Sequence, residues 1–308
     1  MSIKDNYIVA IGGANMDLYA QSHEPLILED SNIGKLGFSA GGVVRNIAEN
    51  LARFGSKVFL LSVVGDDIWG KTLIKQTKEA GVETKYCLSL QNRQTSTYLS
   101  VHQPSGEMKV AINDMTIVDE LSPSYLKHHK ALIQQAHIVM IDANLSEQAL
   151  AYIFSLNHDC VFVDPVSVIK AKRLLPYLNQ IKLIKPNHHE LAILAGQIVE
   201  DEESQNLALK KLHNQGVEYI FLSRGEKGAY MSHKDYLKCF PIIKQDVKNV
   251  TGAGDATMAA IAHGYIKGWS WERIGQFAMM AAYITASSST TINPNITEKM
   301  IVEKMESL

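Results

Sequence analysis

The chain has 308 residues, of which 46% are hydrophobic and 20% are charged, and its formal net charge is −2. These values fit a globular protein with a large core, and they argue against bulk electrostatic binding to nucleic acid or to an anionic membrane. The three cysteines form no CxxC pair, which argues against a disulfide framework or a zinc ribbon. With no signal-peptide core and no apolar run as long as a membrane span, the sequence predicts a cytoplasmic protein.

A first strand is expected at residues 7–11, and it runs into Gly12-Gly13-Ala14-Asn15-Met16-Asp17. Ligands of open α/β folds bind at the carboxyl ends of the strands, so Asn15 and Asp17 are candidate binding residues. Residues 18–40 have no helical period, and we expect irregular chain with short strands there.

The next segment is a helix that opens on Gly41 and Gly42 and ends near Gly55. Two glycines at a helix start let a ligand approach the backbone, and Asn46 could point at the same ligand. The alternative at this point is a helix that is simply entered by a flexible turn.

A P-loop pattern, G-x-x-x-x-G-K-[ST], occurs at residues 65–72, after a predicted buried strand at 57–64. A P-loop surrounds phosphates with backbone N–H groups and a lysine, and the carboxylates of Asp66 and Asp67 would repel those phosphates. We therefore expect an acidic N-cap on the following helix. A P-loop NTPase that uses Lys71 remains as an alternative.

Alternating residues at 95–102 and 108–112, around a Pro-Ser-Gly turn, predict a hairpin with no helix after it. Together with strands from the first segment, it predicts a small lid sheet, inserted at about 16–40 and 95–113, that could exclude water from a ligand. From residue 122 onward, helix-like and strand-like runs alternate. This alternation predicts an α/β fold with a mostly parallel sheet and helices on both faces, within one domain of residues 1–308.

Two histidine pairs, His128-His129 and His188-His189, invite a metal interpretation. Adjacent residues on a helix point in different directions, so we expect these side chains to be packing or surface residues. A further glycine turn at residues 223–228 is typical of a hairpin, although its backbone could also border a nucleotide.

The most informative stretch is Thr251-Gly252-Ala253-Gly254-Asp255, between a strand-like run and a helix-like run. Small residues at a helix N-terminus leave backbone N–H groups free to bind an anion, most often phosphate. A carboxylate at such a site can take the proton from an attacking hydroxyl group during phosphoryl transfer. The alternative is a tight turn in which Asp255 only caps the helix.

These motifs resemble the ribokinase-like (PfkB) carbohydrate kinases over nearly the whole chain. The resemblance rests on four motifs in the order of that family: Gly41-Gly42 with Asn46, Gly65-Asp66-Asp67 with Gly70, Asn187 with Glu190, and Thr251-Gly252-Ala253-Gly254-Asp255. Within the family, the chain is most similar to the pseudouridine kinases, in residues 41–51, 142–145, 164–167 and 249–252. The resemblance implies a three-layer α/β/α domain with a mostly parallel sheet and a small β-sheet lid. It also implies transfer of the γ-phosphoryl group of ATP to the 5′-hydroxyl of a nucleoside, with pseudouridine as the expected acceptor.

The resemblance further implies a role for each matching residue. Asp255 would be the base, and Gly252, Ala253 and Gly254 would form the anion hole. The ribose-binding residues would be Asn15, Asp17, Gly41, Gly42 and Asn46, with Asn144 near the transferred group. The ATP-binding residues would be Lys185, Asn187, Ser223, Gly225, Gly228 and Thr251, and Glu190 would hold Mg²⁺ through water. Side chains between Thr97 and Ile112 would face the nucleobase.

Some features are left open by the resemblance. Ribokinases usually have aspartate at a monovalent-cation site where this chain has Asn249, which argues against potassium activation and against ribose as the acceptor. Ribose, fructose or adenosine remain as other acceptors, and a non-catalytic ligand-binding regulator remains as another class of function. We expect a small-molecule substrate, no nucleic acid or membrane partner, and a homodimer formed through the lid.

Overall fold

The computed structural model describes residues 6–234, 236–243 and 251–307. In this part of the chain, the main sheet has eight strands in the spatial order β14-β13-β12-β11-β10-β9-β1-β4. Their bounds are β1 Ile8–Ile11, β4 Val58–Leu61, β9 Ile138–Asp142, β10 Val161–Asp164, β11 Leu183–Ile184, β12 Tyr219–Ser223, β13 Ala229–His233 and β14 Tyr236–Phe240. The strands from β4 to β12 in this order are parallel, and β13 and β14 are antiparallel. The expected mostly parallel sheet is confirmed.

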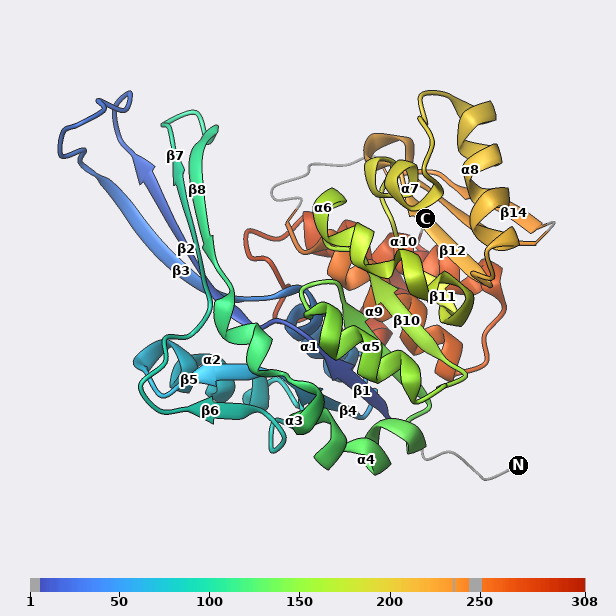
Figure 1. The fold of residues 1–308 in the computed structure, drawn as a ribbon. Helices are drawn as coiled ribbons and strands as arrows, with labels where there is room; N and C mark the ends of the chain where they lie inside the picture. Colours follow the sequence, from blue (N-terminus) through green and yellow to red (C-terminus); the bar gives the residue numbers. More distant parts are fainter. Residues whose placement is uncertain (1–5, 235, 244–250, 308) are drawn as a thin grey trace.

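Helices cover both faces of this sheet (Figure 1). One face carries α1 Val43–Arg53, α9 Ala253–Ile266, α10 Trp271–Ala286 and α11 Glu298–Glu306. The other carries α3 Pro123–His128, α4 Lys130–Gln135, α5 Glu147–Ser155, α6 Val168–Ala171, the 3-10 helix η2 Lys172–Gln180, α7 His188–Ala195 and α8 Glu202–Asn214. Alternate residues of each strand enter opposite cores: Ile8 and Ala10 pack on the first side, Val9 and Ile11 on the second. The three-layer α/β/α architecture is thus confirmed.

A second sheet projects from the main body (Figure 1). We call it the lid sheet; its strands are β2 Asn15–Ser22, β3 Gly34–Gly41, β7 Thr97–His102 and β8 Met108–Asp114, in the order β3-β2-β7-β8. Strands within irregular chain were expected at 18–40, and β2 and β3 are present there with irregular chain between them, but each strand is longer than expected, with eight residues. Pairing of β2 with a partner on each side stabilises an extended conformation that its own sequence pattern does not indicate.

Other boundaries differ from the sequence expectations. The predicted strand at 57–64 is divided at Ser62 into β4 and β5 Val63–Gly65, and β5 pairs with β6 Leu88–Leu90 in a separate small sheet. Ser62 Oγ donates to the carbonyl of Gly12 at 2.7 Å, which fixes the point of division. Strand β14 and helix α11 were not anticipated. Helix α2 Ile68–Glu79 follows β5, and short 3-10 turns, η1 Thr116–Glu120 and η3 Gly225–Lys227, complete the described elements. None of the described helices is long and apolar enough to cross a membrane.

Candidate active site

The carboxyl ends of β1, β9, β10 and β11 lie at one edge of the main sheet, beside the N-termini of α1, α7 and α9 (Figure 1). Parallel strands place the residues that follow them at the same edge, which is where ligands of such folds bind. Most of the residues singled out in the sequence follow one of these strands or begin one of these helices.

The start of α9 is built by a glycine in a left-handed conformation. Gly252 has φ 84°, and a β-carbon at this position would lie 1.9 Å from the carbonyl oxygen of Thr291. Only glycine fits this turn. Gly252 is the N-cap of α9 and has no side chain, so within the described residues no N-cap side chain bonds to the first N–H groups of the helix.

Asp255, in the first turn of α9, is held by a distant residue. Asn46 Nδ2 donates to Asp255 Oδ2 at 2.8 Å. The other end of the Asn46 amide is fixed as well, because Arg45 Nη2 donates to Asn46 Oδ1 at 2.5 Å. Arg45 is only 1% exposed and is anchored by Glu49 Oε2, 2.6 Å from its Nη1. These contacts give Asp255 a defined orientation and a role beyond capping its own helix.

The pKa of Asp255 is raised to about 7. Burial is the main cause, and the nearby negative charge of Asp164 adds to it, while Asn46, Lys185 and Arg45 oppose the rise. A general base is most effective when its pKa lies near the working pH, so Asp255 is suited to accept a proton near neutrality.

Lys185 lies at the entrance to α9. A β-carbon added to Gly254 would be 3.4 Å from Lys185 Nζ, and the same ammonium group pairs with Asp164 Oδ2 at 3.1 Å. Burial alone would lower the pKa of Lys185, but the carboxylates of Asp164, Asp255 and Glu190 outweigh that effect and raise it. A charged ammonium group therefore stands beside the N-terminus of α9, a combination that favours a phosphate anion.

Asn187 and Glu190 form a capping box at the start of α7. The Asn187 side chain accepts from the Glu190 N–H, and Glu190 Oε2 accepts from the Asn187 N–H, both at 2.9 Å. Burial and the charge of Asp164 raise the pKa of Glu190, while Lys185 opposes them. Mg²⁺ prefers oxygen ligands and keeps several of its waters. The capping box uses Oε2 of Glu190, so the other carboxylate oxygen of Glu190, near Asp164, fits such an ion. Asn187 also forms a parallel bridge to Ser223, which places both predicted ATP-binding residues together.

The predicted ribose-binding residues form a second group, at the base of the lid sheet. Asn15 Nδ2 donates to Asp17 Oδ1 at 2.6 Å. A β-carbon at Gly41 would lie 2.4 Å from Asp17 Oδ2, so the glycine makes room for that carboxylate. Gly42 has φ 99° and lies against the backbone of Gly13. Burial raises the pKa of Asp17, and Asn15 and Arg45 counteract it. Arg45 therefore acts on both Asp17 and Asp255.

Asn144 is engaged by protein groups at both ends of its amide. Its Nδ2 donates to Asp142 Oδ2 at 2.9 Å, and its Oδ1 accepts from Lys170 Nζ at 2.5 Å. The fully buried Asp142 also accepts from the N–H groups of Gly13 and Val44, and burial raises its pKa to about 6. Asp142 thus ties the end of β1 and the start of α1 to β9. The structure places Asn144 in this supporting network.

The remaining nucleotide-binding candidates are less closely gathered. Gly228 accepts a backbone hydrogen bond from Arg224, and a side chain on it would meet the carbonyl of Phe240, so the hairpin needs this glycine for its own packing. Gly225 has open space around it, and Thr251 is exposed just before α9. Asn249, on which the cation-site argument depends, lies outside the described residues.

The P-loop alternative does not fit the structure. Asp67 is the N-cap of α2 Ile68–Glu79 and accepts from the Gly70 N–H and from the N–H and hydroxyl groups of Thr95. The predicted acidic N-cap is confirmed. Lys71 Nζ pairs instead with Asp66 Oδ1 at 2.9 Å on the surface. A carboxylate of the protein occupies the place in which a P-loop would hold phosphate.

Sequence reasoning missed the roles of Arg45, Asp164 and Lys170. Arg45 lies inside the glycine-rich motif, next to Asn46, and forms one helical row with Glu49 and Arg53, which looks like an exposed charged face in the sequence. Its burial therefore cannot be read from helical periodicity. Asp164 ends a predicted strand, as Asp142 does, and that position was the available signal.

Comparison with known proteins places the chain in a family. The model of the pfkB family carbohydrate kinases matches residues 5–298. The chain belongs to the PfkB family of carbohydrate kinases. It is similar to the pseudouridine kinase of Escherichia coli (strain K12), with 40% identity over 303 residues, which are 98% of this chain and 97% of that protein. As a PfkB-family member close to that enzyme, it is a phosphotransferase with an alcohol group as acceptor.

Solved structures agree with this assignment. A carbohydrate kinase from Agrobacterium tumefaciens matches with a TM-score of 0.85 and 25% identity, covering 98% of this chain and 97% of that one. Ribokinase of Arabidopsis thaliana, solved with ribose and ATP, matches with a TM-score of 0.85 and 23% identity, covering 98% and 99%. The second match shows the shared fold.

Proposed function

We propose that this PfkB kinase transfers the γ-phosphoryl group of ATP to the 5′-hydroxyl of pseudouridine, giving pseudouridine 5′-phosphate. The observation that carries the proposal is the juxtaposition of Asp255, held by Asn46, with Lys185 at the N-terminus of α9. Such a site can deprotonate a hydroxyl group and stabilise a phosphoryl group in the same place. The 40% identity to the E. coli pseudouridine kinase favours pseudouridine as the acceptor.

In the proposed reaction, Asp255 takes the proton of the 5′-hydroxyl as its oxygen attacks the γ-phosphorus. A bond forms between these two atoms, and the bond from the γ-phosphorus to the bridging oxygen of ADP breaks. The N–H groups at the start of α9 and the ammonium group of Lys185 stabilise negative charge on the transferred group. Asn46 keeps the carboxylate of Asp255 oriented, and Asp17 and Asn15 offer hydrogen-bonding partners for a vicinal diol.

ATP and Mg²⁺ are the proposed cofactors. Asn187, Ser223 and Lys185 would hold the phosphates, with Gly225, Gly228 and Thr251 at the border of the nucleotide. Glu190 would hold Mg²⁺, largely through water, and the ion supplies charge neutralisation for the β- and γ-phosphates when bound. The lid sheet would close over the acceptor and exclude water, which would otherwise compete as the attacking group. A cytoplasmic location is part of the same proposal.

Homodimerisation through the lid sheet is also proposed. The register of its strands places Leu18, Phe38, Leu99 and Ile112 on one face, and the face that holds Asp17 is the opposite one. On the apolar face, Phe38 is 60% and Ile112 is 63% exposed. A second copy with the same apolar face would remove these side chains from water.

The proposed acceptor is tested with a panel of substrates. The protein is incubated with Mg-ATP and pseudouridine, uridine, adenosine, fructose or ribose, and products are identified by mass. Pseudouridine is expected to gain one phosphoryl group at the highest kcat/KM. A higher kcat/KM for another acceptor would move the proposal to that substrate, and binding without any transfer would support a regulator.

A further inference from the structure

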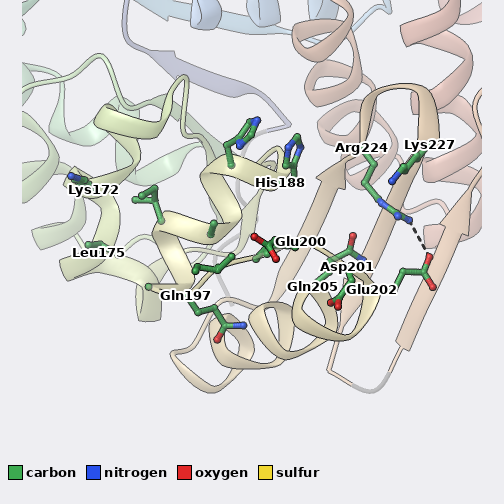
Figure 2. Close-up of a pocket in the computed structure, with 16 residues that line it drawn as sticks. Lys172, Leu175, His188, Gln197, Glu200, Asp201, Glu202, Gln205, Arg224 and Lys227 are labelled. Atoms are coloured by element: carbon green, nitrogen blue, oxygen red, sulfur yellow. Dashed lines mark ion pairs between the residues drawn. The ribbon is translucent and has the colours of Figure 1, made fainter.

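A cavity between α7 and the start of α8 lies apart from the group around Asp17. Figure 2 shows its lining side chains, which come from η2, α7, the loop after α7, α8 and the turn after β12. None of the described residues that line it belongs to the lid sheet. The neighbours of Asp17 on the adjacent strands are residues of the lid sheet instead, on β3 and β7.

The register of the lid strands places a row of side chains beside Asp17. Asp17 of β2 is paired with Tyr98 of β7, and Tyr98 is paired with Asn113 of β8. Paired residues on neighbouring strands, about 4.8 Å apart, point to the same face of a sheet. Tyr98 and Asn113 therefore lie on the face that holds Asp17, whereas Leu99 and Ile112 lie on the opposite, apolar face.

Side-chain contacts on β7 and β8 agree with this assignment of faces. The Tyr98 hydroxyl group donates to Met108 Sδ at 3.5 Å, and Met108 is paired with His102 beyond an irregularity in the register. His102 Nε2 lies 2.9 Å from Ser100 Oγ, two positions along the same strand. The face beside Asp17 is thus lined by an aromatic ring and by polar groups, which suits a flat ligand with a polar edge.

Tyr98 offers a flat surface next to the proposed ribose site. Its side chain is half-buried, and the bond to Met108 restricts its ring. In a nucleoside, the base is attached to the ribose carbon next to the one that carries the 2′-hydroxyl group. A ribose diol held by Asp17 would therefore bring the base toward the neighbouring strand, where the Tyr98 ring can stack on it.

Asn113 is the next side chain in this row, beyond Tyr98. It is exposed, and its side chain makes no hydrogen bond to a described residue. A planar amide carries a donor and an acceptor side by side, so it can pair with neighbouring N–H and C=O groups on the edge of a base. The base of pseudouridine has such a pair at N1–H and its C2 carbonyl. Uridine has a C–H group in place of that N–H.

We propose that Tyr98 and Asn113 bind the nucleobase of the acceptor, and that Asn113 selects a C-linked over an N-linked pyrimidine nucleoside. This inference rests on the proposed function and names the residues that would set its specificity. The base would stack on the Tyr98 ring, Asn113 Oδ1 would accept from N1–H, and Asn113 Nδ2 would donate to the C2 carbonyl. Uridine would keep the stacking but lose the bond from N1–H.

The test is binding of pseudouridine and of uridine to the full chain, measured by calorimetry in saturating AMP-PNP and Mg²⁺, without turnover. The wild type is expected to bind pseudouridine about tenfold more tightly than uridine, the effect of one hydrogen bond. Asn113→Leu should weaken the binding of pseudouridine more than that of uridine and remove most of this preference. Equal binding of the two nucleosides by the wild type, or an unchanged preference in Asn113→Leu, would overturn the assignment.

The stacking surface is tested separately. Tyr98→Ala should weaken the binding of both nucleosides by about tenfold, whereas Tyr98→Phe keeps the ring and should bind both as the wild type does. Equal losses in these two variants would contradict stacking on Tyr98. Ile112→Val is the matched control, because Ile112 is next to Asn113 on the opposite face, and it should change neither affinity. A lower unfolding temperature of Asn113→Leu, with equal losses for both nucleosides, would make Asn113 purely structural.

Failure of this inference can be distinguished from failure of the proposed kinase reaction. If pseudouridine binds with the predicted preference but Mg-ATP yields no phosphorylated product, the proposed reaction is overturned and base recognition stands. If product forms but Asn113→Leu keeps the preference, the inference is overturned and the reaction stands. If the wild type binds neither nucleoside, both are overturned.

Discussion

The side-chain amide of Asn46 donates to Asp255 Oδ2 at 2.8 Å, although the two residues are 209 positions apart in the chain. This bond joins the first turn of α1 to the first turn of α9. Arg45 fixes the orientation of the Asn46 amide, because the guanidinium of Arg45 donates to the amide oxygen. The NH₂ group of Asn46 therefore faces the carboxylate of Asp255. Asp255 is therefore oriented before any substrate arrives.

The rate of phosphoryl transfer should depend on the charge of Asp255. With its pKa raised to about 7, the carboxylate is protonated and inactive below that pH, so kcat should fall as pH drops through neutrality. Asn46→Leu removes a donor that favours the charged form, so the pKa should rise and the acidic limb of the pH profile should move to higher pH. The measurement is kcat against pH for both proteins.

Lys71→Ala is the control for this profile. Lys71 is paired with Asp66 on the surface and has no role in the proposed reaction. Its removal should therefore leave the acidic limb and kcat nearly unchanged. An unmoved limb in Asn46→Leu would refute the coupling to Asp255, and a loss of ATP turnover in Lys71→Ala would restore the P-loop alternative.

Two glycine substitutions in one motif should behave differently. Gly254 has open space up to Lys185 Nζ, so Gly254→Ala should keep the unfolding temperature but intrude on the phosphate site and lower kcat/KM. Gly252→Ala places a methyl group against the Thr291 carbonyl at a positive φ, so it should lower both stability and activity. Thermal unfolding and kinetics of the pair test this; equal stability losses would contradict it.

Lys185→Met should reduce kcat by about 10²–10³, the effect of removing one charged donor to a developing oxyanion. Methionine keeps the approximate length of the side chain but has no ammonium group, so Asp164 also loses its ion-pair partner. Steady-state kinetics with saturating ATP gives kcat, and a rise in KM for ATP with unchanged kcat would show that Lys185 binds the ground state only.

The dimer proposal gives a simple prediction on the lid sheet. Ile112→Asp places a charge on the exposed apolar face and should shift the protein to monomer, whereas Lys109→Asp, also on β8, should not. Analytical ultracentrifugation of the two variants and the wild type measures this. A wild type that is monomeric at all concentrations would contradict the proposal.

Much of the fold could be predicted because its signals are local. The βα alternation from residue 122, the glycine-rich helix starts and the Asp67 N-cap all depend on residues close in sequence. The length of β2 and β3 could not be predicted, since β2 pairs with β7, more than seventy residues away, and β3 pairs with β2.

The candidate site likewise contains residues that the sequence predicted and residues that it did not. Asp255, Asn46 and Gly254 stand in recognisable motifs, and the structure brings them together. The charges that tune the base, Arg45 and Asp164, come from a helix face and a strand end that look structural in the sequence. Gly228 shows the converse, because a residue expected to border the nucleotide has a packing reason of its own.

The central claim is that Asp255 deprotonates the acceptor, and Asp255→Asn tests it most directly. Asparagine can keep the bond from Asn46 but cannot take a proton. Because the folded-state pKa of about 7 lies above the ordinary value of 3.8, the carboxylate costs stability as pH rises between these values, so the variant should unfold at no lower temperature than wild type at pH 8.

The decisive measurement is single-turnover transfer from Mg-ATP to pseudouridine, alongside calorimetric binding of both substrates. Asp255→Asn should bind ATP and pseudouridine as the wild type does, and should transfer the phosphoryl group about 10²–10⁴-fold more slowly. Transfer at a near-normal rate by the folded variant would contradict the assignment of Asp255 as the base.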